Sequence, residues 1–469
     1  MKMKPASINR LALVVVLTSL IQPVLAQKKH ALTVQQAVDY AKKNSVQVKN
    51  ILLDVKLQEE VNKQVTANAY PQLSARAGVN YNPNIAVQSF PNFIAAATYG
   101  VLQQEGVKNG GGQPIVAPGD FGLIEAQFGT KYTANVGLDL SQILFDGQVF
   151  VGLQARKTVI DLAKKDVEVT EELIKANVIK VYYQLVASKT QIAILNSNIE
   201  RLDKLEHDTR EMFKNGFAEN LDIDKIAVQL ANVHTEKQKA ENAISNGFLG
   251  LKLLLGMPMK DELILSDTLT DAKIKEGVLE VDTYNFTDRK EYQYAEIGKK
   301  LNEYNIKRYK LSQVPTVSLS SSYSKNAQRN KFDFFGKGDW FTFSNISLNI
   351  NVPIFKGFYT RSKIDEAKLN LQKTMNNIEG LKLSIDNQVE TARTNFKSAI
   401  ESMDYQKKNM KLAEQVFDQT QKKFYAGLGS NTEITAAQTE FKIAQTNYIN
   451  AMYDAIVAKV DFLKAIGKL

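Results

Sequence analysis

The residues best suited to catalysis or metal binding are scattered along this chain and form no recognisable constellation. The histidines are His30, His207 and His234, far apart in the sequence, and there is no cysteine. No nearby carboxylates share ligand spacing with them, so the sequence predicts no metal site. The glycine-rich segment 109–112 lacks the Lys-Ser/Thr pair of a phosphate-binding loop. We therefore expect a protein that is not an enzyme and needs no cofactor.

Carboxylates at two predicted helix starts are more informative. Asp222 and Asp224 follow a turn at Gly216, and Glu433 follows a turn at Gly427. A carboxylate in a first helical turn stabilises the positive end of the helix dipole, which is the ordinary explanation for such residues. The glycines are likewise typical of turns that need positive φ after a helix.

The segment around the first turn is repeated around the second. Residues 213–220 are echoed 211 positions later by residues 424–431, and the helical register that follows is echoed too. The apolar positions of the later copy are Ile434, Ala437, Phe441, Ala444, Tyr448, Ala451, Ala455, Ala458 and Phe462. Their strict 3-4 spacing predicts a coiled-coil seam, and in the earlier copy only Lys237 interrupts it. A duplicated unit indicates a fold built from two similar halves.

The first 26 residues have the pattern of a secretory signal peptide. Lys2, Lys4 and Arg10 precede an apolar run that is too short to span a bilayer, and small residues lie before Gln27. After this segment no run of about 18 apolar residues occurs, so no transmembrane helix is expected. The formal net charge is +9, but the sequence has no basic stripe interleaved with aromatic residues, which argues against nucleic-acid binding.

Four segments change from helical to alternating periodicity. We predict strands at about 72–81 and 131–144 in a first repeat, 27–256, and at about 315–323 and 341–354 in a second, 288–469. Long helices are expected at about 146–215, 219–255, 358–425 and 431–467, and a helix capped by Thr33 with Gln36 at about 33–69. A long loop at about 82–129 separates the first two strands, and an irregular segment at 257–287 connects the repeats.

The predicted fold class is α+β, a membrane protein with a duplicated helix-strand-strand-helix-helix repeat. Each strand is long enough to cross a membrane when tilted and has one apolar face. Four such strands cannot satisfy their edges in lipid, so several chains must share one barrel. A trimer would give a 12-stranded β-barrel, continuous with a long α-helical coiled-coil barrel.

Aromatic residues gather at the loop end of the second strand pair. Phe334, Phe335, Trp340, Phe341 and Phe343 lie where an interfacial aromatic girdle is expected. Packing in a small loop core is the alternative for any one of them.

Taken together, these features resemble the TolC-like outer-membrane factors of bacterial efflux pumps and type I secretion systems. The resemblance covers essentially the whole chain after the signal segment. It rests on the order and duplication of several features rather than on one motif. They are the opening helix with Leu32, Thr33, Ala37, Ala41 and Asn44, the prolines Pro71 and Pro315 before the outgoing strands, Phe145-Asp146-Gly147 and Phe355-Lys356-Gly357 after the returning ones, and the paired turns.

The resemblance implies a homotrimer in the outer membrane of a Gram-negative bacterium, extending into the periplasm. It also implies passive passage of small molecules or polypeptides from an inner-membrane pump through a periplasmic adaptor. Adaptor docking would fall on the helical tips, which are Lys214, Asn215, Gly216, Phe217, Tyr425, Ala426, Gly427, Leu428 and Gly429. Acidic rings at the periplasmic entrance would involve Asp222, Asp224 and Glu433, although Ala436 stands where a second acidic residue often lies.

A periplasmic coiled-coil adaptor or a trimeric surface scaffold without a lumen is the alternative function. An adaptor would have a single helical hairpin between β-rich modules. A scaffold would lack strands that return into a matched second helix. The sequence leaves the cargo, the cognate pump and the gating residues open.

Overall fold

A computed structural model describes residues 28–276 and 284–469, so the predicted signal peptide lies outside the described residues. The chain divides into two compact units. The helical unit comprises the described parts of 1–60, 157–303 and 368–469, and the sheet unit comprises 61–156 and 304–367. Several long helices begin in one unit and end in the other.

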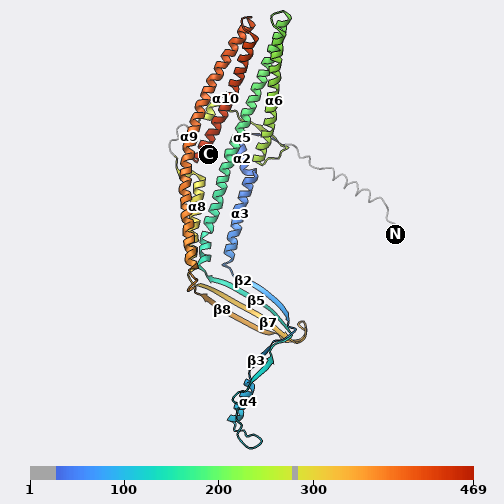
Figure 1. Ribbon diagram of the computed structural model, residues 1–469, viewed down its shortest axis with the longest axis vertical. Coiled ribbons are helices and arrows are strands. Elements are labelled where there is room, and N and C mark those ends of the chain that lie inside the picture. The colour runs from blue at the N-terminus through green and yellow to red at the C-terminus, as the bar shows by residue number, and fades with distance from the viewer. Residues whose placement is uncertain (1–27, 277–283) are drawn as a thin grey trace, which may run out of the picture. The chain divides into compact units, whose positions relative to one another are not determined.

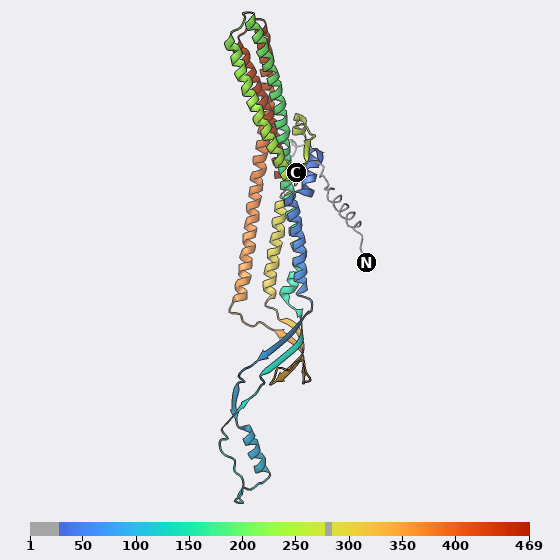
Figure 2. The ribbon, with the colours of Figure 1, turned by 90° about the vertical axis from the view of Figure 1, so that its right-hand side faces the viewer.

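Two long helical hairpins dominate the helical unit. The first joins α5 (Gly147–Lys214) to α6 (Asn220–Leu255), and the second joins α9 (Tyr359–Tyr425) to α10 (Asn431–Ala465) (Figure 1). The turned view in Figure 2 shows the two hairpins still side by side near their turns. The predicted seam is buried in α10 at Ile434, Ala437, Phe441, Ala444, Ala451, Ala455 and Phe462, and in α6 at Ile223, Ile226, Val233 and Leu251.

Shorter elements complete the helical unit. They are β1 (Lys29–Leu32), α2 (Val34–Asn44), α3 (Val46–Ala67), β6 (Glu262–Leu265), α7 (Asp271–Lys275), η1 (Phe286–Asp288) and α8 (Lys290–Leu311), of which α3 and α8 end in the sheet unit. Strand β1 pairs with β6 in parallel. The predicted cap of α2 is confirmed, because the Gln36 N–H donates to Thr33 Oγ1 at 3.3 Å and the Thr33 N–H donates to Gln36 Oε1 at 2.9 Å.

The single helix expected over about 33–69 is instead two helices broken at Ser45. Ser45 has φ −53° and ψ 133°, which is not helical. The backbone of Gly256 passes so close that a Cβ at this position would lie 2.2 Å from Asn44 O. Gly256 also has φ 68°, which ends α6 and favours glycine. Gly256 and Asn44 are more than 200 positions apart in the sequence. The sequence around Ser45 therefore did not predict the break between the two helices.

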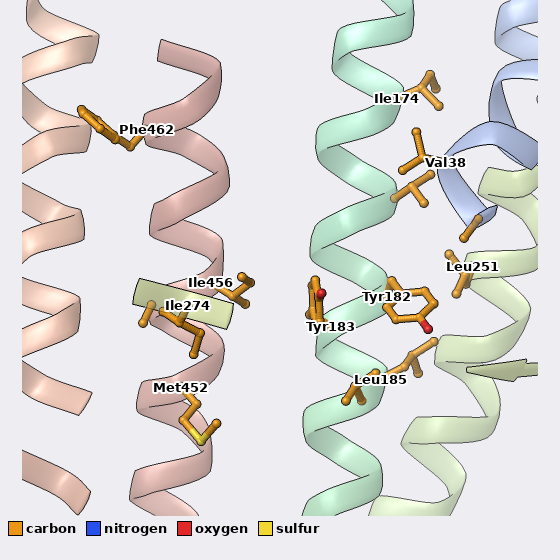
Figure 3. Close-up of a cluster of buried hydrophobic side chains, with 14 of the residues drawn as sticks. Val38, Ile174, Tyr182, Tyr183, Leu185, Leu251, Ile274, Met452, Ile456 and Phe462 are labelled. Carbon is orange, nitrogen blue, oxygen red and sulfur yellow. The ribbon is translucent and has the colours of Figure 1, made fainter. Parts of the chain in front are cut away.

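Tyr182 ties the N-terminal elements to α5. Its ring is fully buried, and in Figure 3 it points from α5 toward Leu251 of α6 with Val38 of α2 nearby. Its hydroxyl donates to Leu32 O at 2.8 Å and accepts from the Asp267 N–H at 3.1 Å. Burial raises the pKa of Tyr182 to about 12, so the hydroxyl keeps its proton at physiological pH.

The sheet unit contains four antiparallel strands in the order β2-β5-β7-β8. Their bounds are β2 Gln72–Tyr81, β5 Tyr132–Phe145, β7 Thr316–Arg329 and β8 Phe341–Asn351 (Figure 1). Within the part of the chain that the structure describes, β2 and β8 each have a partner on one side only. The sheet therefore ends in two open edges.

The strand registers sort the side chains into two faces, because neighbouring partners point the same way. The apolar face contains Leu73, Ala75, Ala77, Val79, Tyr81, Tyr132, Ala134, Val136, Leu138, Leu140, Val317, Leu319, Tyr323, Ala327, Ile346, Leu348 and Ile350, with Gln142, Ser321, Lys325, Arg329, Thr342 and Ser344 as its polar members. The polar face contains Ser74, Arg76, Gly78, Asn80, Thr133, Asn135, Gly137, Asp139, Ser141, Ser318, Ser320, Ser322, Ser324, Asn326, Gln328, Asn345, Ser347 and Asn349. Arg76 and Asp139 form an ion pair of 2.8 Å on the polar face.

The segment predicted as a loop at about 82–129 contains regular structure. Strands β3 (Val87–Pro91) and β4 (Leu123–Gln127) pair antiparallel, and helix α4 (Phe93–Gln104) lies between them. Asn92 caps α4 by accepting from the Ala95 N–H at 3.0 Å. Aromatic contacts hold the segment together, with Phe90 and Phe128 ring centroids 5.4 Å apart. These elements were not predicted because the segment is rich in Gly, Pro and Gln.

No described helix is both long and apolar enough to cross a membrane.

We predict that Asp267→Asn destabilises the helical unit. The Asp267 carboxylate accepts from the Val34 N–H at 2.7 Å, at the start of α2, and pairs with Lys273 at 3.0 Å. Burial alone would raise the pKa of Asp267, but these two hydrogen bonds outweigh it and hold the pKa below its ordinary value. Weakening them should cost about 1 to 3 kcal/mol.

The same pair gives a pH dependence with a definite sign. Because the folded-state pKa of Asp267 is lowered, its contribution to stability is present above about pH 4 and is lost as pH falls through the folded-state pKa. Thermal unfolding in detergent, followed by circular dichroism, should show a smaller acid-induced loss in Asp267→Asn. Exposed Asp54→Asn is the matched control, and equal acid sensitivity of all three proteins would contradict the prediction.

Candidate functional site

The ends of the two helical hairpins have the same backbone geometry. After α5, the Phe217 N–H donates to Met212 O at 2.9 Å, and the Gly216 N–H donates to Phe213 O at 3.0 Å. After α9, Leu428 donates to Lys423 O and Gly427 to Phe424 O, both at 3.0 Å. This pair of bonds is the Schellman motif, and both glycines have the positive φ it requires, 78° and 73°.

Both turns present one large apolar side chain to solvent. Phe217 is 79% exposed and Leu428 is 77% exposed. The residue after a Schellman glycine frequently packs back onto its own helix. Here these two side chains project outward instead, so each tip offers an apolar contact at a fixed backbone position.

The remaining predicted tip residues support these turns. Lys214 forms an ion pair with Glu211 at 2.7 Å, and Asn215 Nδ2 donates to Glu211 O at 2.7 Å. The Ala426 N–H donates to Lys422 O at 3.1 Å. Gly429 lies tight against its own turn, because a Cβ there would come within 3.2 Å of the Phe424 backbone nitrogen.

Two of the predicted acidic residues, Asp222 and Glu433, lie in the first turns of α6 and α10, and Asp224 lies just beyond the first turn of α6. Asp222 accepts from the Glu219 N–H at 3.3 Å and lies 3.7 Å from Lys225. Asp224 accepts from Asn220 Nδ2 at 3.2 Å. The N–H of Glu433 donates to Ser430 Oγ at 3.2 Å, while its side chain is exposed. Asp222 therefore acts in a helix cap, and the Glu433 side chain faces solvent.

A buried asparagine brings the starts of α6 and α10 together. Asn431 is 7% exposed, and its Nδ2 donates to Asp222 O at 3.0 Å. Further along the two helices, Gln229 Nε2 donates to Thr439 Oγ1 at 2.8 Å, and Lys442 pairs with Glu236 at 2.8 Å. The two hairpins are thus joined by polar contacts as well as by the apolar seam.

A second link joins the hairpins at the end of α9, and sequence reasoning missed it. The Tyr425 hydroxyl donates to Asp208 Oδ2 of α5 at 2.8 Å. Burial and this hydrogen bond raise the pKa of Tyr425 to about 12, so the donor keeps its proton at physiological pH. Asp208 was not predicted because it lies more than 200 residues from its partner.

Behind the tips, a guanidinium lies against two aromatic rings that stack on each other. Arg201 lies 5.4 Å from the ring centroid of Phe441 and 5.9 Å from that of Phe417. It also donates to Asn198 Oδ1 at 2.6 Å. Burial lowers the pKa of Arg201, yet an arginine with an ordinary value above 12 remains charged. This cluster stabilises the junction of the two hairpins by cation–π contact.

The five predicted interface aromatics divide into three environments. Phe334 is 7% exposed and packs with Ala134, Ala327 and Trp340 at one end of the apolar face. Phe335 is 96% exposed in the turn. Phe341 pairs with Asn326 and Phe343 with Ser324, which places both on the polar face.

In residues 28–276 and 284–469 the structure has no group of three or more His, Cys, Asp or Glu side chains able to hold a metal ion. The arrangement at the tips combines exposed apolar contacts, exposed carboxylates and breakable links between two hairpins.

Comparison with known proteins defines the class. Residues 289–468 match the family described as "Outer membrane efflux protein", and this part of the chain is a domain of that family. The predicted resemblance to TolC-like outer-membrane factors is thereby confirmed. The predicted outer-membrane localisation agrees with the family description and is confirmed at that level.

Individual relatives cover most of the chain at low identity. The chain is 20% identical to Outer membrane protein TolC of Vibrio cholerae over 71% of its own length and 77% of that protein. Its fold matches a crystal structure of CusC with a TM-score of 0.72 at 15% identity, covering 92% of this chain and 91% of that one. It also matches the Campylobacter jejuni CmeC outer membrane channel with a TM-score of 0.70 at 16% identity, over 93% and 85% of the two chains.

These matches establish the fold as that of outer-membrane efflux channels, with mixed α and β structure that is mostly helical. The family consists of channel proteins, which agrees with the predicted non-enzymatic role.

We predict that Gly427→Ala loosens the second tip. An alanine at φ 73° is strained by about 1 kcal/mol or more although no atom blocks its Cβ. Hydrogen exchange of the peptide covering the turn should accelerate about five-fold. Gly380→Ala is the matched control, because it lies within α9 with open space around it and should leave the tip unchanged. Equal exchange in both variants would show that the positive φ does not limit this turn.

Proposed function

We propose that this protein is the outer-membrane channel-tunnel of a tripartite efflux pump or a type I secretion system. It would passively conduct small molecules or polypeptides from a pump and adaptor to the exterior. One observation carries the proposal most directly: a four-stranded sheet with two open edges, one apolar face and one polar face. Such a sheet could form part of a barrel wall, with its apolar face toward lipid and its polar face toward water.

The open edges support assembly into a closed barrel. In lipid, each unpaired backbone group costs several kcal/mol, so β2 and β8 need partners from other copies. Three copies would give 12 strands, an even number that leaves a lumen. The apolar face is uncovered within the chain, with Leu73 69%, Leu348 59% and Ile350 62% exposed. Lipid would cover it in a homotrimer.

The hairpins would form the wall of a periplasmic tunnel. Helix α5 has 68 residues and α9 has 67. At 1.5 Å per residue each would span about 100 Å. Their 3-4 seams provide the lateral contacts that a coiled-coil barrel needs.

The tips would dock a periplasmic adaptor, which connects the protein to its inner-membrane pump. Phe217 and Leu428 supply the apolar contacts, and the rigid turns around Gly216 and Gly427 position them. Small apolar contacts surrounded by polar residues are typical of protein interfaces.

Asp222, Asp224 and Glu433 would form negative rings at the periplasmic entrance when repeated about a three-fold axis. Rings of carboxylates favour cations at a constriction. The hydrogen bond from Tyr425 to Asp208 would hold the two hairpins of each chain in their present spacing beside these rings.

The alternative function, an adaptor or a scaffold without a lumen, receives no support from the family match. Electrophoresis of a detergent extract with and without heating tests it cheaply. A barrel trimer should change its mobility on heating, whereas an adaptor should not.

We predict that Asp222→Asn with Glu433→Gln weakens the cation selectivity of single channels in planar bilayers, with only the Asp224 carboxylate of each copy left in the rings. The amides keep hydrogen-bonding capacity, so the helix starts should remain capped while most of the ring charge is lost. Glu401→Gln serves as the charge control, since Glu401 is exposed in the middle of α9. Unchanged selectivity in the double variant would show that the selective constriction lies elsewhere in the tunnel. An absence of channels from folded, inserted wild-type protein would overturn the proposed function.

We also predict that Tyr425→Phe raises the open probability of these channels. The substitution removes only the hydroxyl that donates to Asp208, so the hairpins lose one link worth about 1 kcal/mol or more. Tyr405→Phe is the matched control, because Tyr405 is 69% exposed on the same helix. Equal open probability in Tyr425→Phe and wild type would show that this link does not restrain the entrance.

A further inference from the structure

Two phenyl groups lie on the polar face of the sheet, near the 330–340 turn. Phe341 lies opposite Asn326, and Phe343 lies opposite Ser324. Along β8 the next residues on this face are Asn345, Ser347 and Asn349. Neither ring is covered within the chain, since Phe341 is 63% exposed and Phe343 is 53% exposed.

Trp340, Tyr81 and Tyr132, at the same end of the sheet, lie on the side of the apolar face. Trp340 lines a mostly apolar cavity with Ala75, Val136, Leu138 and Tyr323, to which Arg76 and Lys325 also contribute. Tyr81 and Tyr132, also on the apolar face, stack with ring centroids 4.8 Å apart. Strand register therefore separates two groups of aromatics: one suited to a lipid interface, and Phe341 with Phe343 on the side away from it.

An exposed phenyl ring on a water-facing surface has a clear energetic consequence. Apolar surface gains about 25 cal/mol per Å² when it leaves water, and a phenylalanine buries on the order of 150 Å² or more when fully covered. Two adjacent rings thus offer a substantial contact to an apolar partner. Pairing of the β8 edge with another copy occurs in the plane of the sheet, while side chains stand perpendicular to it. Edge pairing would therefore place side chains of the neighbouring strand beside these rings and leave their outward faces open.

We propose that Phe341 and Phe343 form an apolar collar inside the lumen that binds apolar or aromatic solutes in transit. This inference rests on the proposed function, because it requires the polar face to line a conduit. A 12-stranded barrel is about 24 Å across between backbones, so two rings from each of three copies narrow the lumen without closing it. The collar selects by contact rather than by blocking the pore.

Cysteine labelling tests where the rings point. The chain has no native cysteine, so Phe343→Cys and its neighbour Ser344→Cys each create a single thiol. A charged, membrane-impermeant maleimide applied to reconstituted trimers should label position 343 at least about ten-fold faster than position 344, since lipid excludes charge. Asn345→Cys is the positive control on the polar face. Slow labelling at 343 with fast labelling at 345 overturns the collar, including the case in which a neighbouring copy covers the ring.

Channel block tests the chemistry of the collar. Tetraphenylphosphonium and tetramethylammonium have the same charge, but only the first has aromatic surface. In wild-type channels, tetraphenylphosphonium added from the side of the 330–340 turn should block at lower concentration. In Phe341→Ser/Phe343→Ser the difference should shrink about ten-fold or more. Phe335→Ser is the matched control, because Phe335 is 96% exposed in the turn and belongs to neither face.

The outcomes separate the collar from the proposed function. If wild-type channels form but the double variant and the control are blocked alike, the collar is wrong and the conduit stands. If folded wild-type protein forms no channels, both fail together. If the double variant does not assemble, the same block measurement on Phe341→Ser and on Phe343→Ser alone decides the question: block like that of the control overturns the collar.

Discussion

The unpaired backbone of β2 and β8 is the constraint on which the rest of the structure depends. Every N–H and C=O that faces outward from these edges needs a partner wherever water is absent. A single chain cannot supply those partners with four strands. The apolar face of the sheet makes these backbone partners more necessary. It favours an apolar environment, in which no water is present to hydrogen-bond the unpaired N–H and C=O groups. In the proposed homotrimer, the long helices that continue from the strands along the chain would pack beside those of neighbouring copies.

Periodicity predicted the regular elements well because it reports burial directly. Alternation identified β2 over its full length, and the 3-4 spacing identified seven buried positions of α10, with Tyr448 and Ala458 partly buried. The break at Ser45 escaped because its cause is the approach of Gly256, which is remote in sequence. Helix α4 and the β3–β4 pair escaped because a segment rich in Gly, Pro and Gln has no periodicity strong enough to reveal them.

The candidate site shows the same division. The turn glycines and the first-turn carboxylates were predictable from local chemistry, and each turn has the expected positive φ. The link between Tyr425 and Asp208 was not predictable, since nothing in either segment specifies the other. The face on which Phe343 lies could have been predicted. Alternate residues of a strand share a face, and Phe343 alternates with Ser347 and Asn349 rather than with Ile346 and Leu348. A cluster of aromatics suggested one shared role, while the two-residue period of a strand assigns its members to different sides.

The Schellman turns have a consequence for the speed and entropy of docking. Their paired hydrogen bonds hold the backbone at Phe217 and Leu428 before any partner arrives. An adaptor that engages these side chains would therefore restrict only a few χ angles, whereas a flexible loop would also lose backbone freedom worth about 1 to 2 kcal/mol per residue. Such preorganisation lowers the entropy cost of each of the two small apolar contacts. Repeated around an oligomer, these contacts would give a stable complex through avidity, while each single contact still forms and breaks rapidly.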